Sequence, residues 1–187
     1  MVSDTPEGLA EIYAAELVSQ ATVVTPNAFE AGLLTGMPCT TEQEGRAVCE
    51  ALHAAGPEKV VITSIDQPHA ISLIGSTSGS ISLSPSASSA AAAAVHPAEQ
   101  FQIDVPRLEQ YFGGTGDLLA GLLLAHGAGS RDVNLAAAAS LAVGSVQAVL
   151  GRTLEAREAG AVASGGLQLV ASREALLDPP GVEVAVY

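Results

Sequence analysis

Along the first third of the chain, segments with the apolar spacing of a helix alternate with segments that have the spacing of a strand. Residues 3–21 have the spacing of a helix, with one apolar face made by Leu9, Ile12, Tyr13 and Leu17. Two β-branched runs, residues 22–27 and 59–64, end in polar residues. We expect each run to form a short buried strand.

Two further helices are predicted between these strands. Residues 27–36 predict a short helix that Gly36 closes, and residues 40–57 predict a longer one. Thr41 and Glu44 have the spacing of a capping box at the start of the longer helix. Because helices alternate with strands as far as residue 64, we expect an α/β fold with a mostly parallel central sheet covered by helices.

The second half of the chain is less regular. Residues 69–76 alternate as a further strand, whereas residues 76–98 are a low-complexity Ser/Ala stretch that we expect to form a surface loop, with a weak strand at Ile81–Leu83. Helical spacing returns at residues 114–127 and 133–157, and an edge strand is expected within 181–187. We predict one domain over residues 1–187.

Composition narrows the class of partner. The formal net charge is −13, and such an acidic surface argues against binding to nucleic acid or to anionic membranes. The two cysteines, Cys39 and Cys49, lack metal-binding spacing and are expected to be reduced thiols. The first residues have no basic flank or apolar run of a signal peptide. We therefore expect a cytoplasmic protein without a membrane or nucleic-acid partner.

Three polar or glycine-rich stretches are candidates for a ligand site. Two follow predicted strands, Thr25-Pro26-Asn27 and Thr63-Ser64, and the third is the glycine loop Gly113–Gly116, which opens a predicted helix. In open α/β sheets the ligand lies beyond the carboxyl ends of the strands. If the strands are parallel, all three stretches lie at one edge of the sheet.

The glycine loop has the chemistry of an anion site. Glycines without Cβ atoms let the backbone approach a ligand closely, and the first amides of a helix have no partner within it. The positive end of the helix dipole adds to this attraction for phosphate. Asp117 follows directly, where a carboxylate beside bound phosphate can accept a proton from an alcohol.

Each candidate also has a simpler interpretation. Asp117 fits an ordinary helix start, where acids are favoured. Asn27 fits a turn after proline, Thr63 and Ser64 fit a plain strand end, and Glu30 fits a solvated acid in the first turn of a helix. Their occurrence together, in an order that suits one sheet edge, favours a shared site.

Three segments resemble the pyridoxal kinase family of the ribokinase-like superfamily. They are VVTPNAFEAGLLTG (23–36), GPEKVVITSID (56–66) and FGGTGDLLAGLLLA (112–125). Hydroxymethylpyrimidine kinases typically have cysteine at the position of Asp117, and ribokinase has GAGD in place of GTGD. The resemblance implies a three-layer αβα sandwich and ATP-dependent phosphorylation of the 5′-hydroxymethyl group of pyridoxal, pyridoxine or pyridoxamine, a reaction of vitamin B6 salvage.

The resemblance also implies a role for each candidate residue. Asp117 is the expected base, and Gly114, Thr115 and Gly116 the expected anion hole. The implied ATP contacts are Asn27, Thr63 and Ser64, with Thr25 and Thr63 holding a monovalent cation (K⁺ or Na⁺) and Glu30 acting through Mg²⁺ or another divalent ion. Leu108–Gln110, just before the loop, would approach the nucleotide, although the family is more apolar there. A homodimer is implied for the complete family protein.

In that family the vitamin pocket, the lid and further strands of the sheet precede the first helix seen here. We therefore expect a partial ribokinase-like domain with an unpaired sheet edge, exposed apolar surface and little activity alone. Three hypotheses stay open: a pyridoxal kinase whose front part is supplied otherwise, a non-catalytic nucleotide-binding remnant, and a related hydroxymethylpyrimidine or sugar kinase.

Overall fold

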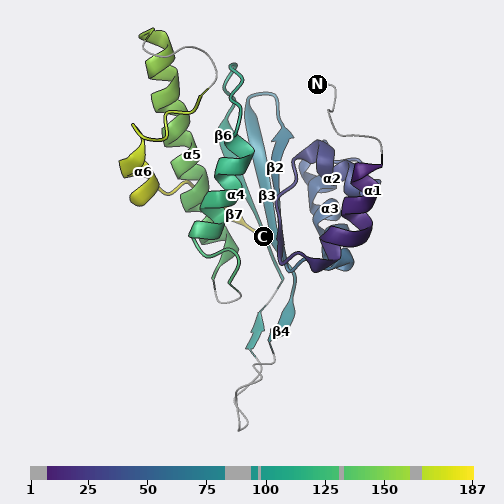
Figure 1. Cartoon of the computed structure of the whole chain (residues 1–187). Coiled ribbons are helices and arrows are strands. Elements are labelled where there is room, and N and C mark those ends of the chain that lie inside the picture. Colours follow the sequence, from purple (N-terminus) through teal and green to yellow (C-terminus); the bar gives the residue numbers. More distant parts are fainter. Residues whose placement is uncertain (1–7, 83–93, 97, 131–132, 161–165) are drawn as a thin grey trace. The chain divides into compact units, whose positions relative to one another are not determined.

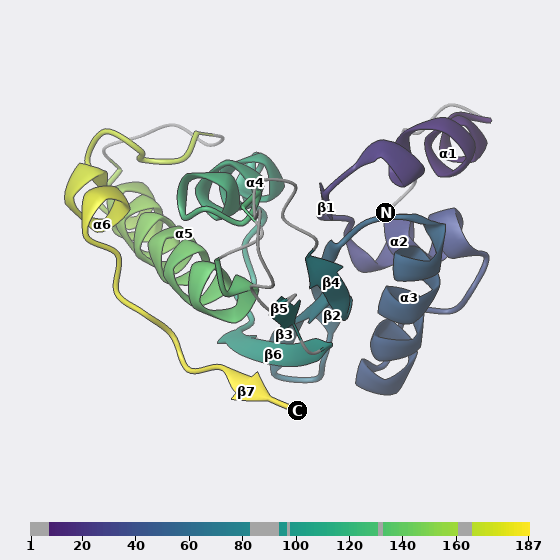
Figure 2. The same ribbon diagram turned by 90° about the horizontal axis from the view of Figure 1, so that it is seen from below.

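The computed structural model describes residues 8–82, 94–96, 98–130, 133–160 and 166–187. They fall into two compact units. Unit 1 takes the described residues of Met1–Ile65, Leu73–Gln102 and Val186–Tyr187, and unit 2 takes those of Asp66–Ser72 and Ile103–Ala185. Most of their helices and strands are labelled in Figure 1, and β1 and β5 are labelled in Figure 2.

Unit 1 begins with an irregular helical segment. It consists of α1 (Leu9–Ile12), a π-helical turn η1 (Tyr13–Leu17) and a 3₁₀ turn η2 (Val18–Gln20). The sequence predicts one helix over residues 3–21, and a continuous helical segment is confirmed over residues 9–20, with π and 3₁₀ turns where a regular α-helix was expected. Three members of the predicted apolar face are about half exposed: Ile12 at 51%, Tyr13 at 48% and Leu17 at 48%. Residues 3–7 of the predicted helix lie outside the described residues.

Helices α2 (Ala28–Thr35) and α3 (Glu42–Ala55) form where the sequence predicts them and lie side by side (Figure 1). The capping box of Thr41 and Glu44 is confirmed, because Thr41 Oγ1 accepts from the Glu44 N–H at 3.2 Å and Glu44 Oε2 accepts from the Thr41 N–H at 3.1 Å. Gly36 ends α2 with φ 67°, a left-handed conformation that favours glycine.

Five strands form one sheet in the order β1-β2-β3-β6-β7. Their bounds are β1 Val23–Val24, β2 Lys59–Asp66, β3 Ala70–Thr77, β6 Glu99–Pro106 and β7 Ala185–Val186. β1 and β2 are parallel, with Val23 opposite Lys59. The sheet is mixed rather than mostly parallel, because β2 and β3 are joined by residues 67–69 alone, and so short a connection allows only an antiparallel hairpin. The Gln67 N–H donates to the Ala70 carbonyl at the closed end of this hairpin, at 3.0 Å.

Strand β6 was not predicted from the sequence, although Phe101, Ile103 and Val105 alternate with polar residues as a strand requires. The Ser/Ala stretch predicted as a loop with a weak strand at Ile81–Leu83 contains the end of β3 and a small antiparallel ribbon of β4 (Ser80–Ser82) and β5 (Ala94–His96). β4 confirms the weak strand to within one residue. Residues 83–93 and 97 lie outside the described residues. The predicted edge strand near the C-terminus is confirmed as β7.

The core of unit 1 joins the helices to the strands. Its buried members come from η2, α2, α3, β2, β3 and the α2–α3 connection: Val18, Ala31, Cys39, Val48, Cys49, Leu52, Val60, Ile62, Ile65 and Ile74. Val60, Ile62 and Ile65 of β2 share this cluster with Val48, Cys49 and Leu52 of α3, as expected for a strand covered by a helix.

Unit 2 contains α4 (Thr115–Ala125), α5 (Leu135–Glu158) and the short α6 (Arg173–Leu177). Helix α4 lies alongside α5, and α6 packs against α5 (Figures 1 and 2). In the described part of the chain, α5 alone is long and apolar enough to cross a bilayer. Its most apolar window is 61% buried within the protein, which is typical of a core helix.

Candidate functional site

The carboxyl ends of β1 and β2 lie side by side in unit 1. The N–H of Thr63 donates to the carbonyl of Pro26 at 3.0 Å, which continues the parallel pairing past the end of β1. Thr63 and Ser64 were predicted to end their strand, but β2 continues to Asp66. Thr25, Asn27 and Ser64 are half-buried, as is Thr63 itself. The structure therefore brings together two of the three stretches predicted from the sequence, and their ligand roles stay predictions.

Asn27 and Glu30 are partners in a second capping box. Asn27 Oδ1 accepts from the Glu30 N–H at 2.8 Å, and Glu30 Oε2 accepts from the Asn27 N–H at 2.9 Å. These bonds satisfy two amides at the start of α2 without any ligand. Neither the side-chain NH₂ of Asn27 nor Oε1 of Glu30 makes a hydrogen bond with the described residues. Both groups therefore remain available to a ligand.

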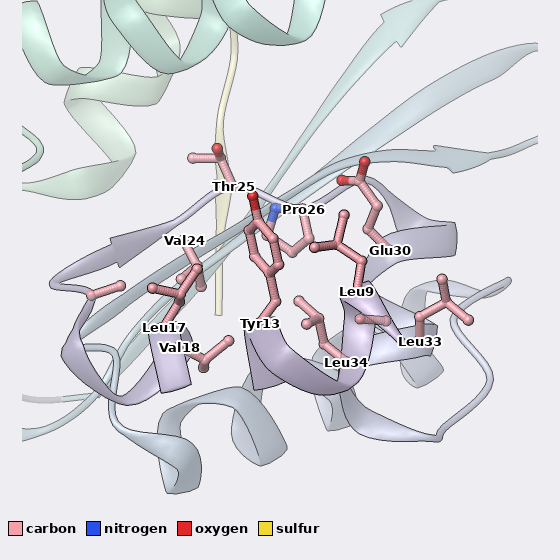
Figure 3. A pocket seen from close by; sticks show the side chains of 12 residues that line it. Leu9, Tyr13, Leu17, Val18, Val24, Thr25, Pro26, Glu30, Leu33 and Leu34 are labelled. Carbon is pink, nitrogen blue, oxygen red and sulfur yellow. The ribbon is translucent and has the colours of Figure 1, made fainter. Parts of the chain in front are cut away.

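An apolar groove of about 430 Å³ lies beside these strand ends. Its lining comes from the first helical segment, β1 and α2: Leu9, Ala10, Tyr13, Leu17, Val18, Ala21, Val24, Thr25, Pro26, Glu30, Leu33 and Leu34. Figure 3 shows the oxygens of Thr25, Tyr13 and Glu30 directed to the same side of the groove. Two of the residues predicted to hold cations, Thr25 and Glu30, thus line one cavity. The half-exposed side chains around it agree with the apolar surface expected from the sequence.

The glycine loop opens α4 as the sequence predicts. Gly114 is the N-cap with φ 83°, and its carbonyl accepts from the Leu118 N–H at 3.0 Å. No side chain caps this helix start, so the amides of Thr115, Gly116 and Asp117 have no helical partner. Asp117 is in the first turn and exposed. A phosphate at this position would meet the positive end of the helix dipole.

The glycines of the loop are not explained by packing. A Cβ placed on Gly113 or Gly116 would meet no atom within 4 Å, and neither residue has a positive φ. Gly75 is the opposite case, because a Cβ there would lie 2.0 Å from the Phe101 ring. The open space beside Gly113 and Gly116 is therefore available for a ligand to approach the backbone.

The three stretches belong to different units. The strand ends are in unit 1 and the glycine loop is in unit 2, so the meeting of Asp117 with Asn27 and Thr63 stays a prediction. Among the described residues no group of three or more His, Cys, Asp or Glu side chains could hold a metal. A divalent ion near Glu30 would need ligands from the substrate as well, which is how Mg²⁺ is usually bound beside phosphates.

Two features of the structure bear on residues outside the predicted site. Burial raises the pKa of the Cys49 thiol to about 12, and burial together with the Glu44 carboxylate raises the pKa of Cys39, so both thiols are held in the unreactive neutral form. Sequence reasoning also missed Arg157, whose guanidinium carbon lies 4.5 Å from the centre of the Phe112 ring, next to the glycine loop. No spacing in the sequence links these two residues.

The comparisons with known proteins define the class first. A model of the phosphomethylpyrimidine kinase family matches residues 5–160, and the chain belongs to this family. Among curated proteins it is 44% identical over 150 residues to the pyridoxal kinase of Arabidopsis thaliana, covering 80% of this chain and 44% of that protein. It is 34% identical over 183 residues to the pyridoxal kinase of Sus scrofa, covering 93% of this chain and 54% of that protein.

Solved structures agree with these relatives. The pyridoxal kinase of Leishmania donovani in complex with ADP and pyridoxine matches with a TM-score of 0.79 and 26% identity, covering 100% of this chain and 59% of that one. The pyridoxal kinase of Trypanosoma brucei matches with a TM-score of 0.76 and 27% identity, covering 98% of this chain and 57% of that one. The predicted resemblance and the ribokinase-like α/β fold class are confirmed. The chain spans about half the length of the curated relatives it matches.

Proposed function

We propose that this chain carries the phosphoryl-transfer part of a pyridoxal kinase, which phosphorylates the 5′-hydroxymethyl group of pyridoxal, pyridoxine or pyridoxamine with ATP and gives pyridoxal 5′-phosphate from pyridoxal in vitamin B6 salvage. Its relatives are named pyridoxal kinases, and one matching structure holds ADP and pyridoxine. The observation that carries the proposal is the uncapped start of α4, where open glycines and Asp117 stand together.

The reaction follows from the chemistry of this helix start. The amides of Gly114, Thr115 and Gly116 hold the terminal phosphate of ATP and stabilise the charge of the transferring phosphoryl group. Asp117 accepts the proton of the vitamin hydroxyl while the hydroxyl oxygen attacks the γ-phosphorus of ATP. The bond from that phosphorus to the β–γ bridging oxygen breaks, and ADP leaves with the electron pair. Catalysis here consists of positioning and electrostatic stabilisation.

The strand ends of unit 1 supply the other nucleotide contacts in this proposal. Asn27 donates its free side-chain NH₂ to a phosphate, and Thr63 and Ser64 line the nucleotide site. The Thr25 and Thr63 hydroxyls are oxygen ligands of the kind that K⁺ or Na⁺ takes. Glu30 Oε1 is the carboxylate oxygen left for the magnesium shell, and Mg²⁺ commonly takes one or two carboxylates together with substrate phosphates. Magnesium supplies charge neutralisation on the phosphates when bound.

The vitamin itself needs residues beyond these. In this proposal they correspond to the part of the related pyridoxal kinases that the chain does not match. A homodimer in the cytoplasm is inferred from the same resemblance, and the two buried, neutral thiols fit a reducing compartment. No nucleic-acid or membrane partner is proposed.

The test separates binding from turnover. Calorimetry with Mg·ATP is run on the 187-residue chain, and pyridoxal phosphorylation is assayed in that chain and in a chimera that joins it to the part of the Arabidopsis pyridoxal kinase that it does not match. We expect the chain to bind ATP and the chimera to phosphorylate pyridoxal. ATP binding without turnover in either form would instead support a non-catalytic nucleotide-binding chain.

The catalytic residue is tested in the same chimera. Asp117→Asn is expected to lower kcat by about 10²–10⁴-fold, the usual contribution of a positioned base. Asp178→Asn removes an exposed carboxylate of unit 2 near the end of α6 and is expected to leave kcat within about twofold, because surface changes have small effects. Equal kcat values in the two variants would exclude Asp117 as the base.

A further inference from the structure

The residues just before the glycine loop are held by one side chain of α5. The Arg157 guanidinium stacks over the ring of Phe112, at 4.5 Å from the ring centre. Its terminal nitrogen Nη1 donates to the backbone carbonyl of Tyr111 at 3.3 Å and to Oε1 of Gln110 at 3.4 Å. One arginine therefore contacts three successive residues that end where Gly113 begins.

The loop has little else to hold it on this side. The loop consists of three glycines and one threonine, and a Cβ at Gly113 or Gly116 would meet open space. Packing within the loop is therefore weak, and its backbone must be held from its two ends. The C-terminal end is held by α4, through the Leu118 N–H and the Gly114 carbonyl. Phe112, which is only 8% exposed, is the anchor at the N-terminal end.

A second contact from the same face of α5 supports this view. Thr153 precedes Arg157 by four residues, so the two side chains lie on one face of the helix. Thr153 Oγ1 accepts from the Gln168 N–H at 3.0 Å, and the neighbouring Leu167 reaches within 4.0 Å of where a Cβ of Gly114 would be. The last two turns of α5 thus hold residues 110–112 through Arg157, and through Gln168 they place Leu167 beside Gly114.

We propose that Arg157 is a positioning residue for the phosphate-binding loop: by stacking on Phe112 and bonding to residues 110 and 111, it fixes where the amides of Gly114–Gly116 point. It acts through Phe112 and is not a catalytic residue. Arginine suits this task because its planar guanidinium can stack on a ring and donate from its edge at the same time. The effect on catalysis rests on the proposed function, whereas the effect on the loop does not.

The test uses Arg157→Met, which keeps the aliphatic stem and removes the planar charge, with Arg157→Lys as the conservative variant. Arg152→Met is the matched control, because Arg152 is on the same helix, exposed, and without a hydrogen bond or ion pair to the described residues. In the chimera, kcat is expected to fall about tenfold in Arg157→Met, since a misplacement of about 1 Å can cost up to 10²-fold. The kcat of Arg157→Lys is expected to lie between those of Arg157→Met and the parent, and the kcat of Arg152→Met is expected to lie within about twofold of the parent value. KM for pyridoxal should not change.

A second measurement does not depend on activity. Backbone ¹⁵N order parameters of residues 113–116 are measured in the 187-residue chain. We expect values of about 0.85 in the parent and in Arg152→Met, and a fall to about 0.6 in Arg157→Met. Thermal unfolding checks that the variants are folded, and Arg157→Lys takes the place of Arg157→Met if the latter is not.

The two measurements separate the proposals. A looser loop in Arg157→Met together with an inactive parent chimera would support the positioning role and overturn the proposed kinase function. Order parameters and kcat that match those of Arg152→Met would overturn the role of Arg157 and leave the kinase function standing. A fall in thermal stability alone, with the order parameters of the loop and kcat unchanged, would also overturn the positioning role of Arg157.

Discussion

The two candidate regions, one in each unit, differ in how much of their structure the protein itself explains. In unit 1 Asn27 and Glu30 bond to each other at the start of α2, and Thr63 bonds to Pro26. In unit 2 the start of α4 has no side-chain cap, and Gly113 and Gly116 face open space. In the first region Asn27 and Glu30 satisfy each other's backbone amides, whereas in the second region the described residues leave amides and open space that water or a ligand can fill.

This difference shows which residues carry the stronger functional argument. Gly114 is the N-cap of α4, and glycine in place of a capping side chain costs a helix only about a few tenths of a kcal/mol. Side chains cap α2, α3 and α5, whereas α1 and α6, of four and five residues, have no side-chain cap, so α4 is the one described α-helix of eight or more residues without one. For Asn27 and Glu30, by contrast, the structural role is sufficient, and a ligand role needs separate evidence.

Among the glycine and capping variants that compare the two regions, the largest effect is expected from Gly116→Ala in the loop. The added methyl would occupy the space proposed for phosphate, and we expect kcat of the chimera to fall by about 10²-fold, comparable to losing one donor of an anion hole. Gly121→Ala, further along α4 and also without a neighbour within 4 Å, is the control. It should leave kcat unchanged and raise the free energy of unfolding by about 0.5–1 kcal/mol. If both variants keep full activity, the open space has no catalytic use.

Gly75→Ala tests the opposite kind of glycine. Its methyl would lie 2.0 Å from the Phe101 ring, so β3 or β6 must shift. We expect a loss of about 1–3 kcal/mol in the free energy of unfolding, as for other overpacked cores. Urea denaturation measures this loss, and ATP affinity of the folded fraction should not change. An unchanged midpoint would show that the glycines of the two regions are equivalent.

Asn27 offers a way to separate its cap from its proposed ligand contact. Asn27→Ala is expected to cost about 1 kcal/mol of stability, whereas Asn27→Ser keeps an oxygen cap and should cost only a few tenths. Both variants remove the side-chain NH₂, so we expect both to weaken ATP binding by roughly tenfold, as for a hydrogen bond to a charged group. Calorimetry that finds normal ATP affinity in Asn27→Ser would leave Asn27 with the cap alone.

The smallest effect concerns the capping box of α3. Hydrogen bonds from the Thr40 hydroxyl and from the Thr40 and Thr41 N–H groups lower the pKa of Glu44 below its usual 4.5. The carboxylate therefore contributes stability that is present above about pH 4.5 and is lost as the pH falls through the lower, folded-state pKa. Urea midpoints between pH 3 and 6 should vary less in Glu44→Gln than in the parent. If the curves of urea midpoint against pH are parallel for Glu44→Gln and the parent, the Glu44 carboxylate makes no such contribution.

Local patterns predicted the elements whose own residues settle them. The capping residues Thr41 and Glu44 and the closing Gly36 place α2 and α3 correctly, and the glycine loop places the start of α4. Strand β6 was missed, because three alternating apolar residues are a weak pattern until β3 is present to pair with them. The first helix was predicted as regular, and its π and 3₁₀ turns depend on packing that spacing does not reveal.

The sequence by itself determined the α/β class, the family and the order of the three chemical motifs, since these depend on spacing along the chain. Only the tertiary structure decided that the sheet is mixed and that Arg157 stacks on Phe112. The capping box of Asn27 and Glu30, by contrast, spans three residues and has a spacing that the sequence already displays. The physical reason is distance: hydrogen bonds and ring contacts act over a few ångströms, and residues 45 positions apart come within that range only after the chain folds.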